Sequence, residues 1–121
     1  MRTFNPFKLS VVVPCFNEQE VIATTHARLI EALGSRSQFS LEIVYVNDGS
    51  RDATETILAS IAKGDPRITV VSFARNFGHQ PAVTAGMAYA TGDAVAVIDA
   101  DLQDPPEVIL RMLDQWQDGF D

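Results

Sequence analysis

Short apolar runs alternate with amphipathic stretches four times along this chain of 121 residues. Each run is rich in Val or Ile and too short for a buried helix, which is typical of strands covered on both faces. The predicted strands are Leu9–Cys15, Glu42–Asn47, Ile68–Phe73 and Ala94–Ile98. Strands that alternate with helices predict an α/β fold, with a mainly parallel sheet, helices on both faces and right-handed crossovers.

Capping residues indicate where the helices begin and end. Asn17 and Glu20 form a variant of the capping box, which predicts a helix that starts at Asn17 and ends at Gly34. The later helices are predicted to end near Gly64, Gly92 and Gly119, with Pro81 in the first turn of the third and Asp104 as the cap of the fourth.

The net charge of −7 restricts the partners that the chain can have. Residues 93–121 carry eight acidic side chains against Arg111 alone, whereas residues 1–92 carry eight acids and eight Lys or Arg. A general nucleic-acid binder needs a basic face, so no nucleic acid is expected as a partner. Cys15 is the only cysteine and no apolar run approaches about 18 residues, so the expected setting is cytoplasmic.

Polar side chains follow all four predicted strands at their carboxyl ends, which is where open parallel sheets bind ligands. Asp99, Asp101 and Gln103 follow the fourth strand, and in an extended chain they would lie on one side as three oxygen ligands. Oxygen ligands of this kind suit Mg²⁺ or Mn²⁺ shared with substrate phosphates. The alternative is a solvated acidic loop before the next helix. The position directly after an apolar strand favours the metal site.

Asp48 and Arg75, which follow the second and third predicted strands, each allow more than one interpretation. Asp48 could accept a hydrogen bond from a nucleotide base, or it could form an Asx-turn into the next helix. Arg75 could neutralise a diphosphate, pair with an acid, or be an ordinary surface arginine. His79 and Cys15 have no partner with the spacing of a zinc site, so both are expected to be structural.

Four segments of this sequence resemble glycosyltransferase family 2, and within it the polyprenyl-phosphate glycosyltransferases. They are Val11–Glu18 (VVVPCFNE), Val46–Asp52 (VNDGSRD), Arg75–Gln80 (RNFGHQ) and Ile98–Glu107 (IDADLQDPPE), and the resemblance covers residues 8–121. The resemblance implies a Rossmann-like GT-A fold, a UDP- or GDP-sugar as donor, Mg²⁺ or Mn²⁺ as cofactor, and inverting transfer of the sugar to a polyprenyl phosphate.

The resemblance also implies roles for single residues. Pro14, Asn17 and Glu18 would line the nucleotide pocket, Asp48 would contact the base, and Asp99 would lie near the ribose and diphosphate. Asp101 and Gln103, together with Asp99, would hold the metal. Arg75 is the least specific of the implied nucleotide-sugar ligands, and the resemblance identifies no catalytic residue in this chain.

Members of the family continue beyond the equivalent of residue 121, so residues 1–121 are expected to be a single domain that forms the N-terminal, donor-binding half of a longer enzyme. The chain alone is expected to be inactive, the whole protein is expected at the cytoplasmic face of a membrane, and an unfinished sheet edge could support a homo-oligomer. The alternatives are a non-catalytic nucleotide- or metal-binding module and a receiver-like phosphotransfer domain. A receiver needs paired acids after its first strand and a late lysine, and no lysine follows Lys63.

Overall fold

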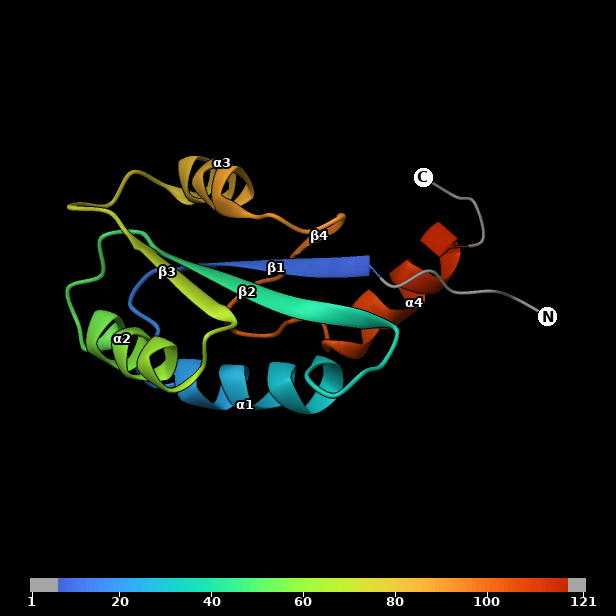
Figure 1. Ribbon diagram of the computed structural model, residues 1–121. Coiled ribbons are helices and arrows are strands. Elements are labelled where there is room, and N and C mark those ends of the chain that lie inside the picture. Colours follow the sequence, from blue (N-terminus) through green and yellow to red (C-terminus); the bar gives the residue numbers. More distant parts are fainter. Residues whose placement is uncertain (1–6, 118–121) are drawn as a thin grey trace.

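The computed structural model describes residues 7–117, which form four parallel strands and four helices (Figure 1). In chain order these elements are β1 (Phe7–Cys15), α1 (Ile22–Leu33), β2 (Phe39–Asn47), α2 (Thr54–Gly64), β3 (Ile68–Ser72), α3 (His79–Tyr89), β4 (Ala94–Val97) and α4 (Glu107–Gln117). The sheet order is β3-β2-β1-β4, so the chain begins in the middle of the sheet and extends it toward both edges. The predicted alternation of strands and helices is confirmed.

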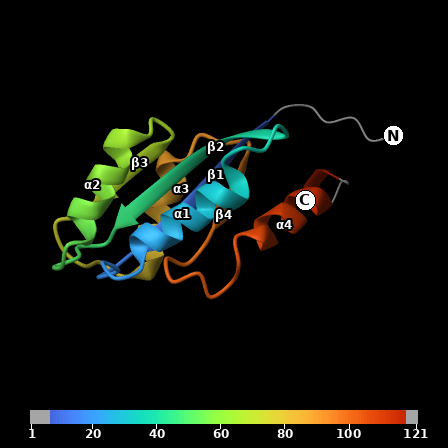
Figure 2. The same ribbon diagram turned by 90° about the horizontal axis from the view of Figure 1, so that it is seen from below.

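Helices cover both faces of the sheet, as expected. The main core lies between the sheet and α1, α2 and α4, where Val11 and Val13 of β1 pack with Leu29, Leu58 and Ile109 of the three helices. On the opposite face, Val12, Val44 and Val46 pack against Ala82 of α3. Figure 2, seen from below, shows α1 in front of the sheet and α3 behind it, with α4 to one side of α1. Alternate residues of β1 therefore belong to different layers, which is why Val11, Val12 and Val13 in its middle are all apolar and buried.

The prediction that Asn17 caps the first helix is wrong. Helix α1 starts five residues later, at Ile22, and Asn17 has a positive φ of 54°. The Asn17 side chain instead accepts a hydrogen bond from the backbone N–H of Arg51 at 2.9 Å, and its own N–H donates to Ser50 Oγ. The Asn17 side-chain oxygen, which a capping box would use for a nearby backbone N–H, is thus bonded to Arg51, 34 positions away. The predicted stop at Gly34 is confirmed.

The two outer strands, β3 and β4, each pair with one neighbour among the described residues. Strand β4 is short, and Val95 and Val97 on it are 40% and 44% exposed. Self-association along such an edge stays a prediction. Within residues 7–117 no helix is both long enough and apolar enough to cross a membrane.

Candidate functional site

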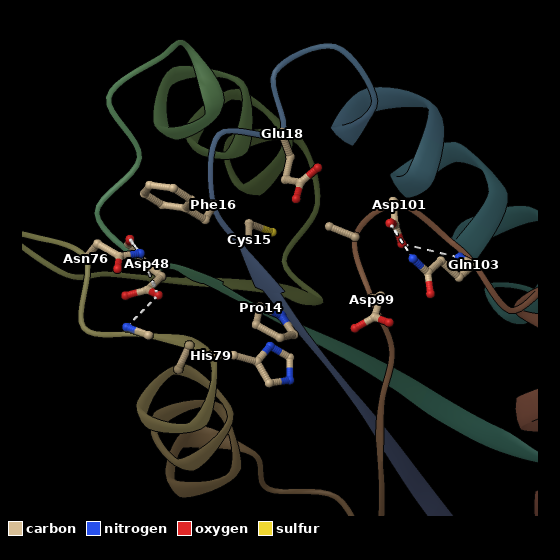
Figure 3. A pocket seen from close by; sticks show the side chains of 13 residues that line it. Pro14, Cys15, Phe16, Glu18, Asp48, Asn76, His79, Asp99, Asp101 and Gln103 are labelled. Atoms are coloured by element: carbon tan, nitrogen blue, oxygen red, sulfur yellow. Dashed lines mark hydrogen bonds between the residues drawn. The ribbon is translucent and has the colours of Figure 1, made fainter.

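A pocket of about 510 Å³ opens at the carboxyl ends of β1, β2 and β4 (Figure 3). Parallel strands end at the same side of a sheet, so segments far apart in the sequence meet there. The pocket is lined by Pro14, Cys15, Phe16, Glu18, Asp48, Asn76, Gly78, His79, Ala82, Asp99, Ala100, Asp101 and Gln103.

Most of the residues predicted as site residues meet in this pocket. Those that line it are Pro14, Glu18, Asp48, Asp99, Asp101 and Gln103. Asn17 and Arg75 do not line it; they lie in an adjoining hollow of about 440 Å³ that shares Phe16 and Asn76 with the pocket. The Arg75 guanidinium lies 4.7 Å from the centre of the Phe77 ring. These two residues would reach a ligand only if it extended beyond the main pocket.

The acidic segment after β4 is a turn and not the extended line predicted from the sequence. The Leu102 N–H donates to the Asp99 carbonyl at 3.0 Å, and Leu102 has a positive φ of 51°. The turn still brings two predicted metal ligands together, because Gln103 Nε2 lies 3.3 Å from Asp101 Oδ2. The small side chain of Ala100 is buried beneath them, and its carbonyl accepts a hydrogen bond from Thr25 Oγ1 on α1 at 2.5 Å.

Negative charge gathers on the side of the pocket where Glu18 faces this turn. Partial burial raises the pKa of the Glu18 carboxyl, and the nearby charges of Asp101, Asp52 and Asp99 raise it further. Among residues 7–117 no three His, Cys, Asp or Glu side chains are grouped closely enough to hold a metal ion by themselves. A cation here would therefore take further oxygen ligands from Gln103, from water or from a bound substrate.

Asp48 lies at the end of β2 and is only 3% exposed. Its carboxylate accepts hydrogen bonds from Phe77 N–H at 2.8 Å, Gly78 N–H at 3.0 Å and Asn76 Nδ2 at 3.0 Å. In the described residues Asp48 does not form the Asx-turn, in which its carboxylate would accept the Ser50 N–H. Asn47 Oδ1 accepts this N–H instead, at 3.1 Å.

Sequence reasoning missed part of the pocket wall. Phe16, Asn76 and Gly78 line it, as does His79, which was expected to be structural. His79 begins α3, and in Figure 3 its ring lies beside Pro14 on the side of Asp99. The available signal was the polar segment Arg75–Gln80 after β3, a strand end like the others.

Cys15 also lines the pocket, but its thiol is buried. Burial and the charge of Glu18 raise the pKa of Cys15, so the nucleophilic thiolate is disfavoured. Its thiol donates to the Val13 carbonyl at 3.4 Å. This geometry fits the structural role that the sequence suggested.

The chain is similar to known proteins over most of its length. The family model described as "Glycosyl transferase family 2" matches residues 10–121. An uncharacterized glycosyltransferase of Bacillus subtilis, YkcC, is 50% identical over 112 residues, which are 93% of this chain and 34% of that protein. The bactoprenol glucosyl transferase of Shigella phage SfX is 48% identical over 114 residues, 94% of this chain and 37% of that protein.

A solved structure has the same fold. The mannosyltransferase PcManGT of Pyrobaculum calidifontis, in complex with GDP-Man and Mn²⁺, superposes with a TM-score of 0.70 at 26% identity, over 84% of this chain and 34% of that one. The superposition confirms the expected glycosyltransferase fold of the GT-A type. The chain spans about a third of the length of the relatives that it matches.

Proposed function

The chain belongs to glycosyl transferase family 2, and from this premise we propose that it forms the donor-binding part of an inverting glycosyltransferase. The proposed donor is a UDP- or GDP-sugar, and the proposed acceptor of the whole protein is a polyprenyl phosphate at the cytoplasmic face of a membrane. The similarity to the bactoprenol glucosyl transferase of Shigella phage SfX, at 48% identity, supports this acceptor class.

One observation carries the proposal for the donor site. Six residues that were predicted as site residues at three separate strand ends line a single pocket, although they are up to about ninety positions apart in the sequence. A volume of about 510 Å³ lies within the usual range for small-molecule sites, roughly 300–1,000 Å³. We propose that the nucleotide occupies the Pro14, Glu18 and Asp48 side and that its diphosphate faces Asp99.

The side chains present fit a hard divalent cation. Asp99, Asp101 and Gln103 supply oxygen ligands. The pKa of the nearby Glu18 is raised by partial burial and by the negative charges of Asp101, Asp52 and Asp99. Mg²⁺ and Mn²⁺ prefer such oxygens and commonly share them with phosphates. Asp101 and Gln103 would hold the ion, with Asp99 beside them. A bound ion would supply Lewis-acid stabilisation of the departing diphosphate.

The chemistry requires positioning more than it requires a strong base. In the proposed reaction an acceptor phosphate oxygen forms a bond to the anomeric carbon, and the bond from that carbon to the nucleoside diphosphate breaks with its electron pair. Because the second pKa of a phosphate monoester is about 6, the attacking oxygen is already ionised at neutral pH. The described residues would therefore bind and orient the donor.

Thermal unfolding with nucleotides tests this proposal. UDP, GDP and CDP, each with and without Mn²⁺ or Mg²⁺, are compared on the wild type, Asp101→Asn and Asp114→Asn, an exposed acid of α4 outside the pocket. A diphosphate at a hundred times its Kd should stabilise the wild type by about 2.7 kcal/mol.

We expect metal-dependent stabilisation that Asp101→Asn abolishes and Asp114→Asn preserves. Stabilisation by acetyl phosphate or beryllofluoride in place of a nucleotide would support the receiver alternative and overturn the proposal. A nucleotide effect that is equal in both variants would remove Asp101 from the site.

A further inference from the structure

We propose that Thr54, the first residue of α2, is a positioning residue that holds Glu18 in the pocket. Thr54 is fully buried and lines neither the pocket nor the adjoining hollow, so it acts on a ligand only through another residue. The inference rests on the proposed function for the nature of that ligand. The hydrogen bonds through which Thr54 acts exist in the protein without nucleotide.

The Thr54 hydroxyl connects the loop after β1 with the loop after β2. Its oxygen accepts the Glu18 N–H at 2.8 Å, and its O–H donates to Asp52 Oδ1 at 2.5 Å. The same carboxylate oxygen accepts the Thr54 N–H at 2.9 Å. Because Asp52 takes the only hydrogen that the hydroxyl can donate, the hydroxyl oxygen is free to turn a lone pair toward Glu18.

The backbone of Glu18 is bonded on both sides. Its N–H is held by Thr54, and its carbonyl accepts the N–H groups of Val21 and Ile22 at 3.0 and 2.9 Å, where α1 begins. The preceding residue, Asn17, has a positive φ of 54°, so the chain changes direction just before Glu18. With both backbone groups engaged, the Glu18 carboxylate reaches the pocket from a fixed point.

The next residue, Gln19, joins the same two loops in both directions. The Gln19 N–H donates to Asp52 Oδ2 at 3.2 Å, and Gln19 Oε1 accepts the Ala53 N–H at 2.9 Å. Thr54 and Asp52 thus bind two successive N–H groups, those of Glu18 and Gln19. The hydrogen bonds of Thr54 and Asp52 to these two N–H groups are called the interloop clamp below.

The interloop clamp determines where the Glu18 carboxylate lies relative to the acidic turn. Phe16 and Glu18 line the pocket from the clamped loop, whereas Asp99 and Asp101 line it from the loop after β4 (Figure 3). Because like charges repel, Glu18 would move away from the acidic turn if its backbone were released. The pocket would then lose a part of the side on which the nucleotide is proposed to bind.

Thr54→Val tests the interloop clamp, because it keeps the shape of the side chain, changes no charge and removes the hydroxyl. Thr54→Ser retains the hydroxyl and is the conservative variant. Ser10→Ala is the matched control, since Ser10 is also fully buried and does not line the pocket. Its hydroxyl donates to Glu42 Oε1 at 2.6 Å and accepts the Gly92 N–H at 2.8 Å, so the same kinds of bond are lost elsewhere in the sheet. Far-UV circular dichroism and thermal unfolding establish that each variant folds.

Amide hydrogen exchange on the protein without nucleotide is the first measurement. We expect the Glu18 amide to exchange at least about tenfold faster in Thr54→Val than in the wild type, because its acceptor is lost. Thr54→Ser and Ser10→Ala should exchange this amide at close to the wild-type rate. Equal rates in Thr54→Val and the wild type would overturn the proposal. This result does not depend on nucleotide binding, so it is separate from any failure of the proposed function.

Calorimetric affinity for the stabilising nucleoside diphosphate with Mn²⁺ is the second measurement. We expect Thr54→Val to weaken binding by about tenfold, and Thr54→Ser and Ser10→Ala to bind like the wild type. Glu18→Ala then separates positioning from a general loosening of the fold. If Thr54 acts through Glu18, Thr54→Val should change the affinity less than about twofold once Glu18 is already replaced.

Additive effects of Thr54→Val and Glu18→Ala, or full affinity in Thr54→Val, would overturn the proposal. If the wild type binds no nucleotide, the proposed function fails and the exchange of the Glu18 amide decides on Thr54. If Thr54→Val does not fold, Asp52→Asn takes its place under the same criteria. The amide of that variant sets an NH₂ group against one of the donors that the Asp52 carboxylate now accepts.

Discussion

The hydroxyl of Thr25 holds the acidic turn on the body of the protein. Thr25 lies on α1 with 2% of its surface exposed, and it donates to the carbonyl of Ala100, which lies between Asp99 and Asp101. No pattern in the sequence distinguishes this threonine from a helix residue that faces the core. Its partner is 75 positions away, so only the folded chain reveals the contact.

Thr25→Val tests this anchor because it keeps the shape of the side chain and removes the donor. The unpaired Ala100 carbonyl should lower the free energy of unfolding by about 1–3 kcal/mol, and the Mn²⁺-dependent affinity for a nucleoside diphosphate should fall as the turn loosens. Urea unfolding and calorimetry measure the two effects. Thr25→Ser, which retains the hydroxyl, is the control, and equal behaviour of the two variants would contradict the anchor.

Glu18 makes the stability of the protein depend on pH. Burial and three neighbouring acids raise its folded pKa above the unfolded value of about 4.3, so the folded protein binds the proton more tightly than the unfolded chain. The Glu18 contribution to stability is therefore fully present below the unfolded pKa and is lost as the pH rises through the higher, folded pKa. This direction is opposite to that of a carboxylate in a salt bridge.

Glu18→Gln removes the ionisation and should therefore make the protein more stable than the wild type at pH 7. The difference should shrink toward pH 3, where Glu18 is protonated in both states, and Mn²⁺ should shrink it at pH 7 by offsetting the negative charge. Urea unfolding at the two pH values measures it. A wild type that is the more stable protein at pH 7 would show that Glu18 makes a favourable contact as an anion.

At the scale of elements, helix α3 packs more closely on the sheet than its composition suggests. A Cβ atom on Gly86 would lie 2.3 Å from Val12 Cγ1 and 3.1 Å from Val46 Cγ2. The absence of a side chain at Gly86 thus sets the separation between α3 and strands β1 and β2. Since α3 also begins with His79, this separation positions one wall of the pocket.

Gly86→Ala should destabilise the fold by about 1–3 kcal/mol, because the added methyl group overpacks the interface and outweighs the better helix propensity of alanine. Gly64→Ala, on the last residue of α2, has open space around it and should be neutral or slightly stabilising. Thermal unfolding of the two variants provides the comparison. Equal stabilities would mean that α3 can move away from the sheet at no cost.

Element boundaries show where local patterns fail. Strand β2 begins at Phe39, three residues before the predicted start, because Phe39 and Leu41 pack in the core although the polar Ser40 lies between them. Helix α3 ends at Tyr89, before the predicted stop near Gly92, since Ala90 is already extended. The strand ends that carry the site were predicted well, because each follows an abrupt change from apolar to polar residues.

At the scale of the whole molecule, part of the net charge of −7 is concentrated at the pocket. The acidic excess begins at Asp93, and its members Asp99 and Asp101 meet Glu18 at one pocket. Glu18 belongs to the balanced part of the sequence, so counting along the chain places it apart from the others. The concentration of acids at the pocket exists only because β1 and β4 are neighbours in the sheet.

The sequence by itself determined the layers and the side of the sheet on which the pocket lies. Apolar periodicity, turn residues and polar strand ends act over a few positions, so they can be identified without tertiary contacts. Only the tertiary structure decided which groups are already engaged: Asn17 with Arg51, Thr25 with Ala100, and Asp48 with the loop before α3. These hydrogen bonds join segments between 29 and 75 positions apart, and a side chain's partner at that separation depends on the packing of the whole sheet.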